Sequence, residues 1–149
     1  MMNEHGALGR FDGTRHIFPV RVYFEDTDLS GIVYHANYLR YMERARSDML
    51  RAVGINQRGA HDGGEGVYAV ADLQIRYKAP AKLDDDLVVV SFVTKVSAAT
   101  TTIQQRVMRG SELLTQGTVT AAWLTTAGRP QRQPREWVAA FTALKEEEE

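Results

Sequence analysis

Three side chains capable of acid–base chemistry lie close together, where a strand pattern gives way to a helix pattern. Asp26 and Asp28 precede Gly31, and His35 follows near the expected start of the helix. A carboxylate beside a polarised carbonyl group acts as a nucleophile or as a base that activates water. Backbone N–H groups in the first turn of a helix lack intrahelical acceptors, and together with the helix dipole they favour an oxyanion. His35 adds a group that donates or accepts a proton near neutral pH.

This combination suits the cleavage of a thioester. The thiol leaving group has a pKa of about 8.5, so it departs without a strong general acid. The residues alone leave two other interpretations open. The aspartates could simply form a turn or a cap. They could also form an Asp-x-Asp metal site, although no third carboxylate or histidine falls at the spacing of an EF-hand loop.

The elements on either side of this loop are predicted from apolar periodicity. Residues 20–25 alternate between apolar and polar side chains, as in a half-buried strand with Phe24 on its apolar face. Residues 37–53 carry an apolar stripe at helical spacing. On that helix, Arg44 and Asp48 are spaced for an i,i+4 ion pair.

The second half of the chain is predicted to consist of strands. Gly54 ends the long helix, a loop spans residues 61–66, and Pro134 opens a short C-terminal helix. The expected strands are 67–77, 87–96, 100–109 and 113–124. This order predicts an α+β fold in which an antiparallel sheet of about five strands packs on one long helix. Because the strand at 87–96 is apolar on both faces, we expect a second subunit to cover the other face.

Composition narrows the class of protein. The chain has 149 residues and predicts one domain at 16–145, between a flexible N-terminal tail at 1–15 and an acidic tail at 146–149. The net charge of -1 gives no sign of a nucleic-acid partner, and no apolar run is long enough to span a membrane. The absence of cysteine excludes disulfides, thiolate zinc sites and a Cys nucleophile. We expect a cytoplasmic protein without a metal ion or a cofactor.

Two segments resemble a known family. The run "VRVYFEDTDLSGIVYHANYLRYMERAR" at 20–46 closely resembles the signature of the hotdog-fold acyl-CoA thioesterases. It is most similar to the 4-hydroxybenzoyl-CoA thioesterase family and, within it, to the branch associated with the Tol–Pal system. The run "YKAPAKLDDDL" at 77–87 is similar to the family's second landmark. The resemblance covers roughly residues 20–124 and is specific, because the first run is long and contiguous.

The resemblance implies roles for individual residues. Asp28 matches the family's catalytic carboxylate, and His35 matches the histidine paired with it. The oxyanion donor is a backbone N–H at the helix start, near Tyr34 and His35. Gly31 lets the loop fold close to the thioester, and Asp26 shapes the loop. The implied reaction converts an acyl-CoA and water into a free acid and CoA.

The resemblance also implies partners. The fold it implies places active sites at the interface of a homodimer, often within a homotetramer. An acyl carrier protein is a second candidate donor of the thioester.

Candidates for substrate binding lie on the helix and among the basic residues. Tyr38, Tyr41 and Met42 are candidates for the acyl pocket, although such residues on a helix stripe more often form core. By their charge alone, Lys78, Lys82 and Arg106 are candidates for contacts with the CoA phosphates. Of these three, Lys78 is the candidate for substrate binding.

Two other functions compete with hydrolysis. A hotdog protein could bind an acyl-CoA or an acyl carrier without cleaving it, since a fold does not dictate an activity. A carrier-linked dehydratase is a further alternative, but its motifs are not found here. An α/β-hydrolase is excluded, because the chain lacks a G-x-S-x-G motif and is short for that fold.

Overall fold

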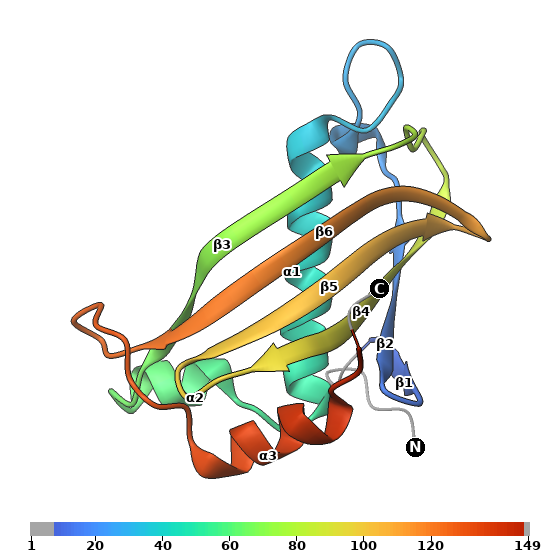
Figure 1. The fold of residues 1–149 in the computed structure, drawn as a ribbon. Helices are drawn as coiled ribbons and strands as arrows, with labels where there is room; N and C mark the ends of the chain where they lie inside the picture. The colour runs from blue at the N-terminus through green and yellow to red at the C-terminus, as the bar shows by residue number, and fades with distance from the viewer. Residues whose placement is uncertain (1–7, 148–149) are drawn as a thin grey trace, which may run out of the picture.

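The fold is an antiparallel sheet packed on one long helix (Figure 1). The computed structural model describes residues 8–147. The long helix α1, His35–Ala52, lies against one face of the sheet. The strands are β1 (Arg10–Asp12), β2 (Arg15–Arg21), β3 (Val67–Tyr77), β4 (Asp86–Val96), β5 (Thr100–Arg109) and β6 (Glu112–Leu124). They form one six-stranded sheet in the order β1-β2-β4-β5-β6-β3. The α+β class is confirmed, with six strands in place of about five.

Three short helices complete the described part of the chain. A 3-10 turn, η1 (Phe24–Asp26), precedes the loop before α1. The helix α2 (Gln57–Asp62) begins four residues before the predicted loop at 61–66, and the sequence analysis missed it. The helix α3 (Arg135–Leu144) lies across one end of the sheet, where it contacts β4 (Figure 1). No helix in residues 8–147 has both the length and the apolar character to cross a membrane.

The apolar stripe of α1 forms the centre of the core. Its side chains Tyr38, Met42, Ala45 and Met49 are all at most 3% exposed. The first three pack against inward-facing residues of the sheet, which include Val89, Val107 and Val119, and Met49 packs in a second cluster with Val93 and Ile103. Gly54 takes φ +86° just after the helix, a backbone conformation that favours glycine, so the predicted C-terminal cap is confirmed.

The strand predicted at 20–25 is displaced. β2 starts at Arg15 and ends at Arg21, where its last residue pairs with Asp86 of β4. The chain then turns through η1, and this turn leaves the Phe24 side chain 82% exposed. Alternation alone could not detect this end, because the end of a strand depends on where its partner strand begins.

Residues at both ends belong to the fold, contrary to the predicted tails. Residues 10–15 form β1, its turn and the start of β2, so the tail prediction is wrong for them; residues 1–7 lie outside the described part. At the other end, Glu146 forms an ion pair with Arg15 at 2.7 Å, and its N–H donates to the carbonyl of Val93. Of the predicted acidic tail, residues 148–149 also lie outside the described part.

The outer face of β4, which faces away from α1, is partly covered by the chain itself. Phe92 on this face is fully buried, because the guanidinium groups of Arg15 and Arg106 lie 4.2 and 5.1 Å from its ring centre. The apolar character of this strand therefore does not by itself require a second subunit.

Asp48 has different partners from the predicted Arg44. Its carboxylate accepts hydrogen bonds from the N–H groups of Leu8 and Gly9, at 2.6 and 2.8 Å. It also lies 2.9 Å from Nε2 of His16, a fully buried side chain. Asp48 thus links the N-terminal segment and β2 to the C-terminal half of α1.

This buried pair predicts that stability depends on pH. Burial lowers the pKa of His16 below its ordinary 6.5, and it outweighs the hydrogen bond and the charge of Asp48, which act to raise the pKa. His16 regains its ordinary pKa on unfolding, so the unfolded state binds the extra proton. We therefore expect the free energy of unfolding to fall as the pH drops below about 6.5. Urea denaturation between pH 5 and 7.5 measures this, and His16→Gln should have a flatter pH profile. An equal slope in both proteins would contradict the prediction.

Candidate active site

The loop before α1 is a short hairpin closed by its own backbone. The N–H of Asp28 donates to the carbonyl of Ile32 at 2.8 Å, and the N–H of Gly31 donates to the carbonyl of Asp28 at 3.1 Å. Thr27 and Val33 pair across its base. Gly31 has φ +81°, which an L side chain rarely adopts, so glycine is needed for this turn.

Asp28 carries its carboxylate on the exposed side of this hairpin. Oδ1 accepts hydrogen bonds from the hydroxyl and the N–H of Ser30, at 2.6 and 2.8 Å. These bonds lower the pKa of Asp28 below its ordinary value, first through the hydroxyl and then through the N–H. A carboxyl group with the ordinary pKa of aspartate is already ionised at neutral pH, as a nucleophile or a base must be, and the bonds from Ser30 keep Asp28 ionised to lower pH.

Asp26 links the loop to the helix through both its side chain and its backbone. Its Oδ2 accepts the N–H of Tyr23 at 2.8 Å, which caps η1. Its carbonyl accepts the N–H of Tyr34 at 3.0 Å and the side-chain amide of Asn37 at 2.9 Å. These contacts support the loop-shaping role expected of Asp26. Asn37 was missed, because its target is a backbone carbonyl eleven residues away.

The N-terminus of α1 is open to solvent. Tyr34 is the N-cap residue and its side chain caps no N–H, so within residues 8–147 the N–H of His35 has no acceptor. The His35 side chain is exposed and its ring centre lies 4.4 Å from that of Tyr34. The carbonyl of His35 accepts the hydroxyl of Tyr77, from the end of β3, at 2.9 Å. The structure records no hydrogen bond between His35 and Asp28, although both border the same loop.

The three helix residues predicted as pocket candidates are core residues. Tyr38, Tyr41 and Met42 are 3%, 1% and 0% exposed, and all belong to the cluster beneath the sheet. The hydroxyl of Tyr38 accepts the N–H of Ala81 at 2.9 Å, and burial raises the pKa of both tyrosines. Burial excludes them from the wall of an open pocket in this chain. Lys78 is exposed and lies on the outer face of the sheet, not beside the loop.

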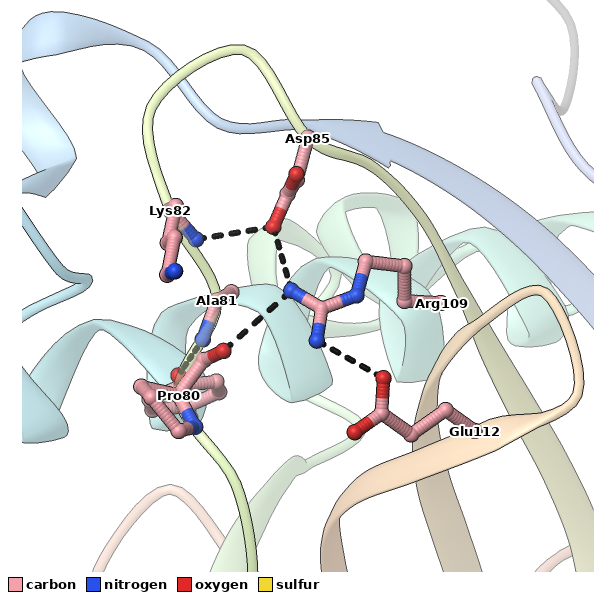
Figure 2. Close-up of polar contacts among 7 residues, drawn as sticks. Pro80, Ala81, Lys82, Asp85, Arg109 and Glu112 are labelled. Atoms are coloured by element: carbon pink, nitrogen blue, oxygen red, sulfur yellow. Dashed lines mark hydrogen bonds and ion pairs between the residues drawn. The ribbon is translucent and has the colours of Figure 1, made fainter.

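The second landmark, at residues 77–87, contacts the end of the loop that leads into α1. Val33 donates its N–H to the carbonyl of Ala81 at 2.9 Å, and Ile32 pairs with Lys82. Figure 2 shows how this segment is held: Arg109, at the end of β5, reaches into its turn. The guanidinium donates to Asp85 and Glu112, both at 2.7 Å, and to the carbonyl of Pro80 at 3.3 Å. The two segments that carry the family resemblance thus touch each other.

Arg109 is predicted to control the rigidity of the loop. A lysine at position 109 has a single ammonium group in place of the planar guanidinium group with its several N–H donors. It therefore cannot bind Asp85, Glu112 and the Pro80 carbonyl together. We expect Arg109→Lys to increase amide exchange at Val33 and Ala81 about tenfold, because local opening becomes easier. Hydrogen exchange followed by NMR measures this. Glu112→Gln is the control, since it keeps the bond to Asp85, and unchanged exchange in Arg109→Lys would refute the prediction.

A cavity of about 320 Å³ lies deeper along α1. It is lined by the middle of α1, by β3 and by Phe141 of α3, and by neither Asp28 nor His35. The candidate site is therefore an ionised carboxylate and an uncapped helix start on an open surface. Within residues 8–147, no three His, Asp or Glu side chains gather in a way that could hold a metal ion.

Comparison with known proteins defines the class. A family model described as the thioesterase superfamily matches residues 30–116, which include Gly31, His35 and the second landmark. This chain belongs to the thioesterase superfamily, and its sheet and long helix form the hotdog fold expected from the resemblance.

Particular relatives have more specific names. The acyl-CoA thioesterase YbgC of Haemophilus influenzae is 43% identical over 129 residues, covering 86% of this chain and 95% of the relative. The acyl-CoA thioester hydrolase YbgC of Escherichia coli O157:H7 is 35% identical over 126 residues, covering 83% of this chain and 93% of the relative. A crystal structure of a probable thioesterase from Bartonella henselae is 33% identical with a TM-score of 0.76, covering 80% of this chain and 99% of that one.

Proposed function

We propose that this protein hydrolyses an acyl-CoA thioester to a free acid and CoA, in the cytoplasm. The observation that carries the proposal is the ionised carboxylate of Asp28 in the hairpin that leads into the uncapped start of α1. The names of the YbgC relatives support the substrate class, since the match covers most of both chains.

In the proposed mechanism, the thioester carbonyl oxygen accepts the N–H of His35. This N–H and the helix dipole stabilise the negative charge that develops on the oxygen. In one route, Asp28 takes a proton from a water molecule whose oxygen attacks the carbonyl carbon, and the C–S bond then breaks to release the acid and the thiolate. In the other route, the Asp28 carboxylate attacks the carbonyl carbon itself, the C–S bond breaks as the thiolate leaves, and water then hydrolyses the resulting anhydride to the acid and free Asp28. In both routes the thiolate is later protonated. His35 is the residue proposed to exchange protons with solvent. Oxygen-18 in the Asp28 carboxylate after a single turnover in labelled water would indicate the anhydride route.

A second copy of the chain is proposed to close the site. β3 is an edge strand, so within residues 8–147 the backbone groups on its outer side pair with no other strand. Val70 and Leu73 on this strand are 53% and 38% exposed, and Tyr77 at its end is 44% exposed and contacts His35. Pairing of two β3 edges in a homodimer, or in a tetramer of such dimers, would cover these residues beside the helix start. Light scattering after size-exclusion chromatography tests this, and a monomer at micromolar concentration would contradict it.

The activity is tested with a panel of short, medium, long and aromatic acyl-CoAs, following the release of free thiol. Turnover of at least one substrate above the rate without protein is expected. Failure to hydrolyse any of them would refute the proposed function.

One alternative has an observation in its favour. Asp28 and His35 are exposed, and the 320 Å³ cavity does not include them, as would suit a protein that binds acyl-CoA or an acyl carrier protein without hydrolysis. Tight binding of an acyl-CoA by calorimetry without thiol release would favour this alternative.

A further inference from the structure

A polar groove of about 340 Å³ lies on the outer face of the sheet. It crosses β5, β6 and β3, which are adjacent in the sheet. Gln105, the neighbour of one lining residue, donates to a carbonyl of α1 at 2.9 Å, so the lining residue Gln104 points to the opposite face. The side chains that line the groove include Gln74, Arg76, Lys78, Gln104, Gln116 and Thr118.

The charge of this groove is entirely positive. Arg76 and Lys78 contribute two cations, whereas no carboxylate lines it. In the part of the chain that the structure describes, neither side chain has an ion pair or a hydrogen bond, in contrast to Arg21, which pairs with Asp86 at 2.8 Å. Unpaired cations beside amide and hydroxyl donors favour an anion with several oxygen atoms, such as a phosphate ester.

The groove and the candidate active site lie on opposite faces of the same strand end. Tyr77 stands between Arg76 and Lys78 in the sequence, and its side chain points the other way, to the carbonyl of His35. Beyond the last residue of β3, the N–H groups of Lys78 and Ala79 still donate to the carbonyl of Leu114 in β6, at 2.8 and 3.1 Å. The groove therefore extends to the same end of β3 at which Tyr77 contacts the helix start, within reach of a long flexible ligand.

We propose that this groove binds the phosphate groups of the coenzyme A part of the substrate, with Arg76 and Lys78 as the contacting cations. The inference rests on the proposed function. Of the three cations considered from charge alone, Lys78 is the one that lines the groove. Arg106 lies on the same face and pairs with Gln116 in the sheet, but its guanidinium lies over Phe92. Lys82 lies in the turn held by Arg109. Arg76 was not considered in the sequence analysis, although strand alternation places it on the same face as Lys78. The strand register adds the polar neighbours on β6 and β5 that complete the groove.

The test compares two thioesters that carry the same acyl group. This acyl group is the one whose CoA thioester the wild type hydrolyses fastest. One is the acyl-CoA, and the other is the S-acyl-pantetheine, which has no phosphate. For the double variant Arg76→Gln/Lys78→Gln, we expect KM for the acyl-CoA to rise about tenfold, because two charge-assisted contacts are lost. We expect kcat to stay the same, and both constants for the pantetheine thioester to stay the same. Added salt should raise KM for the acyl-CoA less in the variant than in the wild type.

The control variant Arg40→Gln/Lys95→Gln removes the same charge from exposed positions outside the groove and should keep the wild-type KM. An unchanged KM for acyl-CoA in the groove variant would overturn the proposal, as would an equal rise with the pantetheine thioester or in the control. Loss of turnover of an acyl carrier protein thioester alone would assign the groove to a carrier and would also overturn it. If the wild type hydrolyses neither small thioester, the proposed function fails, and binding of free CoA by calorimetry then tests the groove with the same variants.

Discussion

Replacement of Asp28 by asparagine should lower kcat/KM about 10²- to 10⁴-fold, the range in which a positioned base contributes to a rate. Asparagine keeps an acceptor for the Ser30 N–H, so the hairpin should remain folded while the ionisable oxygen is lost. Circular dichroism checks the fold, and steady-state kinetics with the best acyl-CoA of the panel measures the effect. Wild-type turnover in Asp28→Asn would show that another group performs the chemistry.

Two variants serve as controls for this result. Asp26→Asn changes the neighbouring carboxylate of the same motif but keeps its acceptor for the N–H of Tyr23, so a small effect is expected.

The second variant, Ser30→Ala, removes the hydrogen bond that contributes most to lowering the pKa of Asp28. Activity needs the ionised carboxylate and is lost as the pH falls through its pKa. Ser30→Ala should therefore move the acid limb of the pH–rate profile to higher pH and leave the plateau nearly unchanged.

Asp48→Ala is expected to produce the largest loss of stability. The substitution removes the acceptor of two backbone N–H groups and the partner of the buried His16. Breaking a buried pair and leaving its partners unsatisfied costs about 3–5 kcal/mol of the free energy of unfolding. Urea denaturation at pH 7 measures this value.

The controls separate the buried contacts from the ion pair that spacing suggested. Asp48→Asn retains one acceptor oxygen and should cost less than Asp48→Ala. Arg44→Ala removes the exposed residue at i,i+4 and should change the free energy of unfolding by less than about 0.5 kcal/mol. A large loss in Arg44→Ala, with little loss in Asp48→Ala, would reverse this assignment.

Local patterns in the sequence determined most of the elements. The strand predicted at 100–109 is found as β5, and the helix predicted at 37–53 is found as α1, two residues earlier at its start. These predictions succeed because a repeat of two or of three to four residues reports which side chains share a buried face. The order of Asp28, Gly31 and His35 before a helix is local in the same sense, so the candidate loop could be identified without coordinates.

Only the tertiary structure decided which distant groups meet. Asp48 finds partners about forty residues away, and Tyr77 reaches a carbonyl 42 residues away. Alternation places Arg76 and Lys78 on one face, but only the strand register places Gln116 of β6 and Gln104 of β5 beside them to form a groove. The physical reason is that such contacts depend on how strands pair and where chains cross, which nearest-neighbour periodicity does not encode. For this protein, the sequence indicated the chemistry of the loop, and the fold decided what holds the loop in place.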